Sequence, residues 1–337
     1  MTITRTLAPD QHPGAPLPDS EFARAAKGAL GTAGIPLRRI AERLDDAGFH
    51  IAPATLSGWG NGVNIPDRTG HTLGRLLALE RVLAAGPGEL VRAYHRTNPG
   101  PWDMRHRARH PLDPTTREAA PGSQKSVLDA RGCTNEGAIA LVDMAEHHQI
   151  GDTRLPVRSD IRLTALALQP GVRSYWVTYT VDDKAPRNVV PGRGCSLGEQ
   201  DTVDGPGYRV RAVELRLEHA LGVGDTADFA FAVVFRRPAP DPRRVPPAGF
   251  FRVVSDPACR RVRLDLSFSP YERPTWVRWV VWDHDTQDRL PFAGMPVRSG
   301  DGHFGQDLTD PGLTAYGYLW SWPAALETAP PAWAGAR

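Results

Sequence analysis

The chain has 337 residues, of which 41% are hydrophobic and 23% are charged. This length exceeds what one small domain needs, and the composition is close to that of soluble globular proteins, so a chain disordered throughout is excluded. The formal net charge is only +2, from 40 basic and 38 acidic residues. Binding to nucleic acid would therefore depend on a local concentration of positive charge, not on the whole chain.

Targeting and redox features are sparse. No stretch approaches the roughly 18 uninterrupted apolar residues of a membrane span, and residues 1–20 lack the apolar core of a signal peptide. Three widely spaced cysteines, Cys133, Cys195 and Cys259, argue against a disulfide scaffold and against a cysteine-based zinc site. We expect a cytoplasmic, nucleoid-associated protein without a cofactor or metal.

Composition changes divide the chain into five segments. Residues 1–19 form a Pro-rich leader that we expect to be disordered, and residues 20–96 show helical periodicity throughout. Residues 97–124 contain five prolines and predict a basic linker. Residues 125–323 carry short alternating runs of apolar residues, which indicate strands, and residues 324–337 form a Pro- and Ala-rich tail.

The first globular segment predicts five short helices. Phe22, Ala26 and Leu30 recur at helical spacing, and Gly34 stands where a helix commonly ends. A second helix opens at Ile35, a third at Pro53, a fourth spans residues 73–83, and a short fifth follows Pro87. Small connections between them predict a compact bundle.

The second segment is predicted to be mostly β. Residues 213–217 and 262–268 alternate between apolar and charged side chains, which indicates one buried and one wet face. Residues 229–235 and 276–282 are apolar at both parities and predict central strands or strands under a second layer. Residues 136–148 fit a strand slightly better than a helix. About seven strands at irregular intervals predict a β-sandwich or a partly open barrel.

Residues 37–62 fit two helices that cross steeply. Such a pair needs a small residue inside the first helix and apolar residues between the two. Pro53 suits the first turn of the second helix, where no backbone N–H is required. The predicted core consists of Ile40, Ala41, Leu44, Ile51, Leu56 and Trp59.

This segment resembles the Xre/Cro-type helix-turn-helix regulators. The family pattern of the second helix is matched by Pro53, Thr55, Leu56, Ser57, Trp59 and Gly62. The later segment also looks like the C-terminal portion of two-domain regulators from high-GC bacteria, at residues 221–229 and 252–257. The predicted fold class is α+β multidomain, with an N-terminal all-α five-helix helix-turn-helix bundle and a C-terminal all-β sandwich-like domain.

Three features depart from the family pattern. The turn between Leu44 and Ile51 is longer, and Ala52 stands at the capping position usually held by serine. Gly58 and Gly60 make the second helix glycine-rich and leave it without an arginine that could hold guanine bidentately. The predicted fold survives these departures, whereas base-specific reading depends on small polar side chains.

The resemblance and the helix geometry predict a DNA interface. The base-reading face would be Ala54, Thr55, Ser57, Gly58 and Asn61. Asn61 has two interpretations, one as a reader of adenine and the other as a helix-ending residue in a left-handed conformation. Phosphate contacts are expected from Arg38, Arg39, Arg43, Arg68 and Arg75. The linker residues Arg105, Arg107 and Arg109 form either a basic arm on DNA or a solvated linker.

Enzyme signatures are weak. Residues 194–198 fit the pattern G-x-S-x-G, but the sequence that follows cannot form the helix that a nucleophile elbow requires. Asp143, His147, His148 and Asp152, and likewise residues 283–285, are interpreted as polar loop ends in preference to metal ligands. We therefore expect a protein that is not an enzyme.

The sequence thus predicts a DNA-binding transcriptional regulator that acts as a homodimer on a palindromic operator. The β-rich domain would sense an effector, bind a protein partner or dimerise. The alternative is an adapter whose helical domain docks a protein partner, which Gly58 and Gly60 favour.

Overall fold

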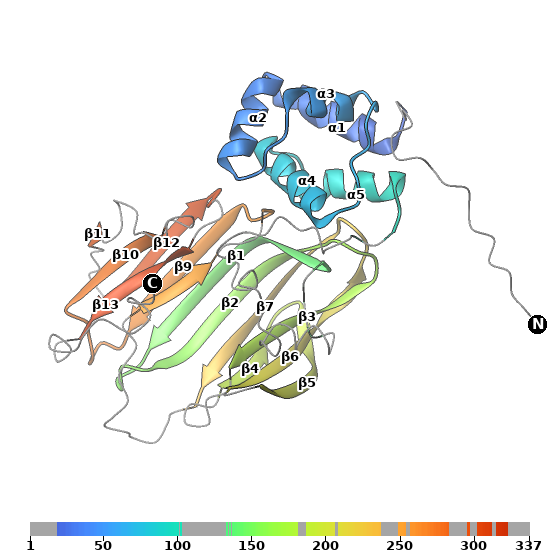
Figure 1. Cartoon of the computed structure of the whole chain (residues 1–337). Helices are drawn as coiled ribbons and strands as arrows, with labels where there is room; N and C mark the ends of the chain where they lie inside the picture. The colour runs from blue at the N-terminus through green and yellow to red at the C-terminus, as the bar shows by residue number, and fades with distance from the viewer. Residues whose placement is uncertain are drawn as a thin grey trace, which may run out of the picture. The chain divides into compact units, whose positions relative to one another are not determined.

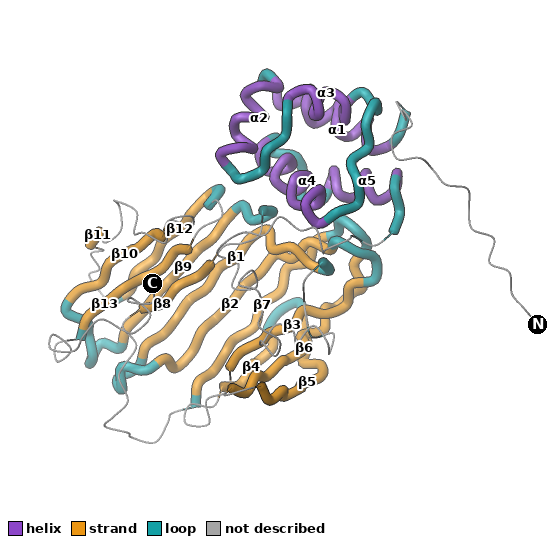
Figure 2. The backbone as a smooth tube through the Cα atoms, in the orientation of Figure 1, coloured by secondary structure: helices purple, strands orange, loops and turns teal. Residues whose placement is uncertain are grey.

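A computed structural model describes residues 19–100, 102, 133, 135, 137–180, 187–205, 208–236, 249–253, 257–282, 295–296, 302–311 and 315–322. The chain divides into two compact units, residues 1–108 and 109–337. The helices described lie in the first unit and the strands in the second (Figure 2). The predicted α+β architecture, with N-terminal helices and a β-rich remainder, is confirmed. The predicted leader and tail, and most of the predicted linker, lie outside the described residues.

Five helices make up the described part of the first unit. They are α1 (Glu21–Ala33), α2 (Leu37–Asp46), α3 (Pro53–Gly60), α4 (Gly70–Val82) and α5 (Glu89–Thr97). Helix α1 packs against α3 and α5, while α2 packs against α3 and α4 (Figure 1). The aromatic rings of Phe22, Trp59 and Tyr94 meet edge to face in the core, with centroids 6.0 Å and 5.5 Å from that of Phe22. Three helices are thereby joined through one aromatic cluster.

The helix ends follow the sequence closely. The Ser20 side chain accepts a hydrogen bond from the Ala23 amide, and Gly34 ends α1 in a left-handed conformation with φ 61°. Ala52 is the N-cap of α3 and offers no side-chain hydrogen bond, and Pro53 occupies the first turn as predicted.

Thirteen strands form three sheets in the described part of the second unit. The strands are β1 (Ile139–Ile150), β2 (Pro156–Ala167), β3 (Val172–Thr180), β4 (Arg187–Pro191), β5 (Cys195–Gly205), β6 (Tyr208–Leu221), β7 (Thr226–Phe235), β8 (Gly249–Val253), β9 (Arg261–Phe268), β10 (Trp276–Trp282), β11 (Met295–Pro296), β12 (His303–Thr309) and β13 (Ala315–Ser321). The sheet orders are β12-β9-β1-β2-β7-β4, β11-β10-β13-β8 and β3-β6-β5. The β1–β9 pair is parallel, whereas the other recorded pairs are antiparallel.

The two smaller sheets cover one face of the six-stranded sheet. Near β9, Leu264 and Leu266 pack with Trp279 and Tyr318 of the four-stranded sheet. Near β7, the aromatic and aliphatic residues of the same face pack with Val213 and Leu215 of the three-stranded sheet. Figure 1 shows β3, β5 and β6 beside β4 and β7, and β10 and β13 beside β9 and β12. The result is a layered, sandwich-like arrangement.

The strand count predicted from the sequence is wrong, while the predicted strands themselves are present. Residues 229–235 and 276–282 form β7 and β10, which are interior strands of their sheets, as their apolar residues at both parities predict. Residues 136–148 belong largely to a strand, β1. Strands such as β5, with the sequence CSLGEQDTVDG, carry few apolar residues and give no alternating signal.

Candidate nucleic-acid interface

The apolar residues predicted to hold α2 and α3 together lie in the core of the first unit. Ile40, Leu44, Ile51, Leu56 and Trp59 are each no more than 3% exposed. Ala41 is partly buried. Because these side chains come from both helices and the turn between them, they fix the position of α3 against α2.

The long turn between α2 and α3 is ordered by its own hydrogen bonds. Gly48 has φ 81°, and the Phe49 amide donates to the Leu44 carbonyl at 2.8 Å. Together with the bond from the Gly48 amide to Asp45, this is a Schellman motif. The Phe49 ring is buried against Gly74 of α4, where a Cβ would lie 2.9 Å from the ring. The additional residues of this turn therefore contribute a core side chain.

Helix α3 presents small, uncharged side chains on its outer face. Ala54 and Asn61 are exposed, and Thr55 and Ser57 are partly exposed. The expectation that Gly58 belongs to this face is wrong, because Gly58 is buried and a Cβ there would meet the Asn64 side chain at 3.0 Å. The four remaining positions carry hydroxyl, amide and methyl groups, which can contact base edges.

Gly60 and Gly62 have structural roles at the end of α3. A Cβ on Gly60 would lie 3.5 Å from the Lys27 Cα, so α1 and α3 approach closely at this point. Asn61 is the C-cap with φ −98°, and the left-handed conformation falls instead on Gly62, with φ 65°. The left-handed interpretation of Asn61 is therefore wrong. Its Nδ2 donates to the Ser57 Oγ at 3.3 Å.

Three of the predicted phosphate-contacting arginines lie exposed on α2. Arg38 and Arg39 both pair with Glu42, at 3.2 Å and 3.0 Å. Arg43 is exposed in the last turn of the helix. Exposed pairs of this kind contribute at most about 1 kcal/mol, so Arg38 and Arg39 can exchange Glu42 for a phosphate at little cost.

Arg68 is held inside the helical unit. Its guanidinium donates to the Gly100 carbonyl, contacts the His95 ring, and stacks over Trp102 with its carbon 5.0 Å from the ring centroid. Burial lowers the pKa of Arg68 from its ordinary value. The predicted phosphate contact conflicts with this environment, because Arg68 instead fixes the segment that follows α5.

Arg75 is also engaged in the fold, since its Nη2 donates to the His50 carbonyl at 3.0 Å and ties α4 to the residues before α3. The arginines of the predicted arm, Arg105, Arg107 and Arg109, lie outside the described residues. Within the described part of the chain, α2 therefore supplies the exposed predicted arginines.

The sequence patterns weighed as enzyme signatures lie partly within the described residues, and residues 283–285 lie outside them. Residues 194–198 form a turn and the start of β5, with no following helix. Asp143, His147 and His148 lie within β1, so their interpretation as loop ends is wrong. Asp152 lies in the turn between β1 and β2, as interpreted. The side chains of Asp143 and His147 point to one face of the sheet, and that of His148 points to the other. The described residues contain no group of three or more metal-ligating side chains placed to hold an ion.

Comparisons with known proteins give little information. Neither a family model nor a curated protein matches the chain. The M1 zinc metallopeptidase from Deinococcus radiodurans is 11% identical, matches 54% of this chain and 42% of its own length, and has a TM-score of 0.27. A mutant of the M1 zinc metallopeptidase from Deinococcus radiodurans bound to a Tyr-Ser-Ala substrate is 12% identical. It matches 55% of this chain and 43% of its own length, with a TM-score of 0.28. The chain spans less than half of these structures, and such a likeness carries no argument.

Two features of the structure escaped the sequence analysis. The first is the buried carboxylate of Glu80 in α4, which accepts a hydrogen bond from the Leu90 amide at the start of α5. The second is a cavity in the β-rich unit that brings together Glu146, His148, Ser159 and Arg187. No described helix is long and apolar enough to cross a membrane.

Proposed function

We propose that residues 20–96 form a helix-turn-helix domain of the Xre/Cro type that binds double-stranded DNA, and that the protein is a transcriptional regulator. The observation that carries this proposal is the state of α3. Leu56 and Trp59 anchor the helix in the core, while Ala54 and Asn61 are exposed and Thr55 is partly exposed. A short helix fixed on one side and presenting small polar groups on the other suits insertion into the major groove.

The different charges of α2 and α3 support the same proposal. Helix α3 contains no charged residue, so its contribution would be direct contact with base edges. Positive charge for the phosphates would come from Arg38, Arg39 and Arg43 on α2. A helix of eight residues contacts few base pairs. We therefore propose a homodimer on a palindromic operator, which doubles the contacts.

The β-rich unit would serve as the sensing or dimerising part of this regulator. Its sandwich-like layers supply a rigid scaffold, and the described part of the chain divides into two compact units as a regulator with separate functions requires. Sedimentation of the full chain measures whether the protein dimerises.

The test is DNA binding by the full-length protein. Duplexes selected from a random library would be titrated by fluorescence anisotropy at several salt concentrations. The Arg38→Ala, Arg39→Ala, Arg43→Ala triple variant should flatten the slope of log K against log salt by up to about 0.9 for each lost phosphate contact.

A matched control removes the same charge from the other unit. Arg173, Arg193 and Arg236 are exposed in the β-rich unit, and their triple replacement by alanine should leave the slope unchanged. If no duplex is enriched and the wild-type protein gives no saturable change in anisotropy with DNA, the DNA proposal fails. The alternative, an adapter that docks a protein through the same domain, would then be the one to pursue.

A further inference from the structure

The β-rich unit contains a cavity of about 500 Å³ on the covered face of its six-stranded sheet. Strands β1, β2 and β7 contribute lining residues from this face, β3 contributes from the three-stranded sheet, and β8 and β13 contribute from the four-stranded sheet. The cavity therefore lies against the six-stranded sheet, between the two smaller sheets that cover this face. Its volume is within the range of about 300–1,000 Å³ that is usual for small-molecule sites.

The walls are largely aromatic. Tyr175, Tyr179, Phe231, Phe235 and Phe250 line the space, and the rings of Tyr175 and Phe231 lie 6.5 Å apart. Aromatic walls favour a ligand with a flat or otherwise apolar body, because stacking adds to the apolar area removed from water.

One end of the cavity carries a hydrogen-bonded chain of three polar residues. The Glu146 Oε2 lies 3.1 Å from the His148 Nε2, and the His148 Nδ1 lies 2.7 Å from the Ser159 Oγ. Glu146 and Ser159 are only 3% and 5% exposed, and the His148 ring packs on Phe250 with centroids 3.6 Å apart. Both ring nitrogens of His148 are engaged, so this end offers a ligand mainly carboxylate and hydroxyl oxygens, which accept hydrogen bonds.

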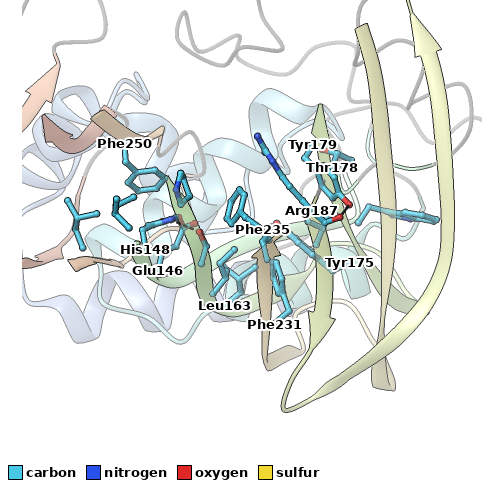
Figure 3. A pocket seen from close by; sticks show the side chains of 18 of the residues that line it. Glu146, His148, Leu163, Tyr175, Thr178, Tyr179, Arg187, Phe231, Phe235 and Phe250 are labelled. Carbon is cyan, nitrogen blue, oxygen red and sulfur yellow. Dashed lines mark hydrogen bonds and ion pairs between the residues drawn. The ribbon is translucent and has the colours of Figure 1, made fainter. Parts of the chain in front are cut away.

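A cation marks the other end. The Arg187 guanidinium carbon lies 5.2 Å from the Phe235 ring centroid and 5.9 Å from that of Tyr179. The Nε of Arg187 is buried and has no hydrogen-bond partner among the described residues. Figure 3 shows His148 and Glu146 beside Phe250 at one side of the cavity, Arg187 toward Tyr179 and Thr178 at the other, and Phe235 between them. The site thus separates an acceptor end from a cationic end.

A second buried donor belongs to a residue that lines the cavity. Trp320 lines the cavity and is 2% exposed, and its Nε1 has no partner among the described residues. Buried N–H groups without a partner are rare in native structures, because each costs the desolvation of a polar group. An acceptor atom on a bound molecule would satisfy such a group.

We propose that this cavity binds a small organic carboxylate with an aromatic or similarly apolar body. The carboxylate lies at Arg187, the body packs between Phe231, Phe235 and Phe250, and a hydrogen-bond donor on the far side faces Glu146 and Ser159. The site belongs to the β-rich unit alone and does not depend on the DNA proposal.

The experiment is isothermal titration calorimetry of the full-length protein with 2-naphthoate, its neutral analogue 2-naphthylmethanol, and 6-hydroxy-2-naphthoate. We expect saturable binding at one site per chain. Arg187→Met should weaken 2-naphthoate about 10- to 100-fold, the effect of one charge-assisted hydrogen bond, and leave 2-naphthylmethanol unchanged. The added hydroxyl of 6-hydroxy-2-naphthoate should tighten binding through the Glu146 end.

Two further variants keep the result interpretable. Arg162→Met removes an exposed arginine of β2 whose parity is opposite to that of the cavity-lining residues, and it should bind every probe as the wild type does. Val233→Trp fills the cavity and should abolish binding while circular dichroism stays unchanged. If this variant unfolds, the proposal is tested by the binding of 2-naphthoate to Arg187→Met alone. Absence of saturable 2-naphthoate binding overturns the proposal, as does equal binding by Arg187→Met. If 6-hydroxy-2-naphthoate binds no more tightly than 2-naphthoate, the proposed contact between a ligand donor and the acceptor end at Glu146 and Ser159 is wrong.

Discussion

The carboxylate of Glu80 accepts a hydrogen bond from the backbone amide of Leu90 at 2.7 Å. The same carboxylate accepts from Gly88 at 2.8 Å and from Val91 at 3.1 Å, and Glu80 is only 2% exposed. Gly88 is the N-cap of α5 and has no side chain to satisfy these amides. A residue of α4 therefore caps α5, and its negative charge lies at the positive end of the helix dipole.

Replacing Glu80 by glutamine should destabilise the helical unit by about 2–3 kcal/mol, because charge-assisted bonds are lost and an amide N–H₂ meets backbone donors. Urea unfolding followed by the helical far-UV signal measures this. Glu89→Gln is the matched control, since Glu89 is exposed at the same helix end and accepts one bond from Gly86. Its effect should stay within about 0.5 kcal/mol. Equal losses for the two variants would remove Glu80 from this role.

The helices were predictable because each carries its own local signal. Gly34 ends α1, Pro53 opens α3, and apolar residues recur at helical spacing in α4. The capping role of Glu80 was not predictable, because it depends on how α4 packs against α5. Gly58 shows the same limit, since a helical wheel places it outward while the chain beyond α3 folds back and Asn64 covers it.

The cavity in the β-rich unit shows why site residues are harder to find than elements. Glu146 and His148 belong to β1, Ser159 to β2 and Arg187 to β4. The register sets His148 opposite Ser159, and nothing in either strand alone specifies that pairing. A signal was present in β1, where Glu146 and His148 stand between Met144 and Ile150 on the face of the strand that is otherwise apolar.

Gly62 should tolerate alanine poorly and Gly58 should tolerate it well. Gly62 has φ 65°, and the left-handed conformation costs a residue with a Cβ about 1–2 kcal/mol. Gly58→Ala meets only the exposed side chain of Asn64, which can move, and it gains helix propensity. Thermal unfolding of the two variants should therefore give a lower Tm for Gly62→Ala and an equal or higher Tm for Gly58→Ala. The opposite order would show that the conformation at the end of α3 differs from that described.

His147 should make the β-rich unit less stable in acid. Burial, and then the neighbouring His303, lower the pKa of His147 below its ordinary value of 6.5, and Asp265 and Asp160 oppose this to a lesser degree. His148 of the same strand acts in the same direction as His303. Because the folded pKa lies below the unfolded one, the unfolded chain binds more protons between the two values. The free energy of unfolding then falls as the pH drops below about 6.5.

The variant His147→Gln should lose less stability than the wild type between about pH 7 and pH 5. Urea unfolding followed by intrinsic fluorescence at several pH values measures the difference. His219→Gln is the control, since His219 is exposed in β6 and its replacement should leave the wild-type slope in place. A slope for His147→Gln as steep as that of the wild type would assign the acid sensitivity to other groups.

Asn61 should read one base pair without supporting the fold. It follows α3 as an exposed C-cap with φ −98°, and its recorded side-chain bond is the one from Nδ2 to the Ser57 Oγ. Releasing that surface bond costs little and frees the carboxamide to pair with adenine N6 and N7. On a selected operator, Asn61→Ala should reduce discrimination at one A·T pair by about 1–3 kcal/mol.

The melting temperature separates the two interpretations of Asn61. If Asn61 reads a base, Asn61→Ala should melt like the wild type and should weaken binding only to duplexes that keep the adenine. Asn188→Ala, at an exposed asparagine of β4 in the other unit, should change neither property. If Asn61→Ala weakens all duplexes equally and lowers the melting temperature, Asn61 stabilises the end of α3. Specificity would then have to come from Thr55 and Ser57 or from the shape of the DNA.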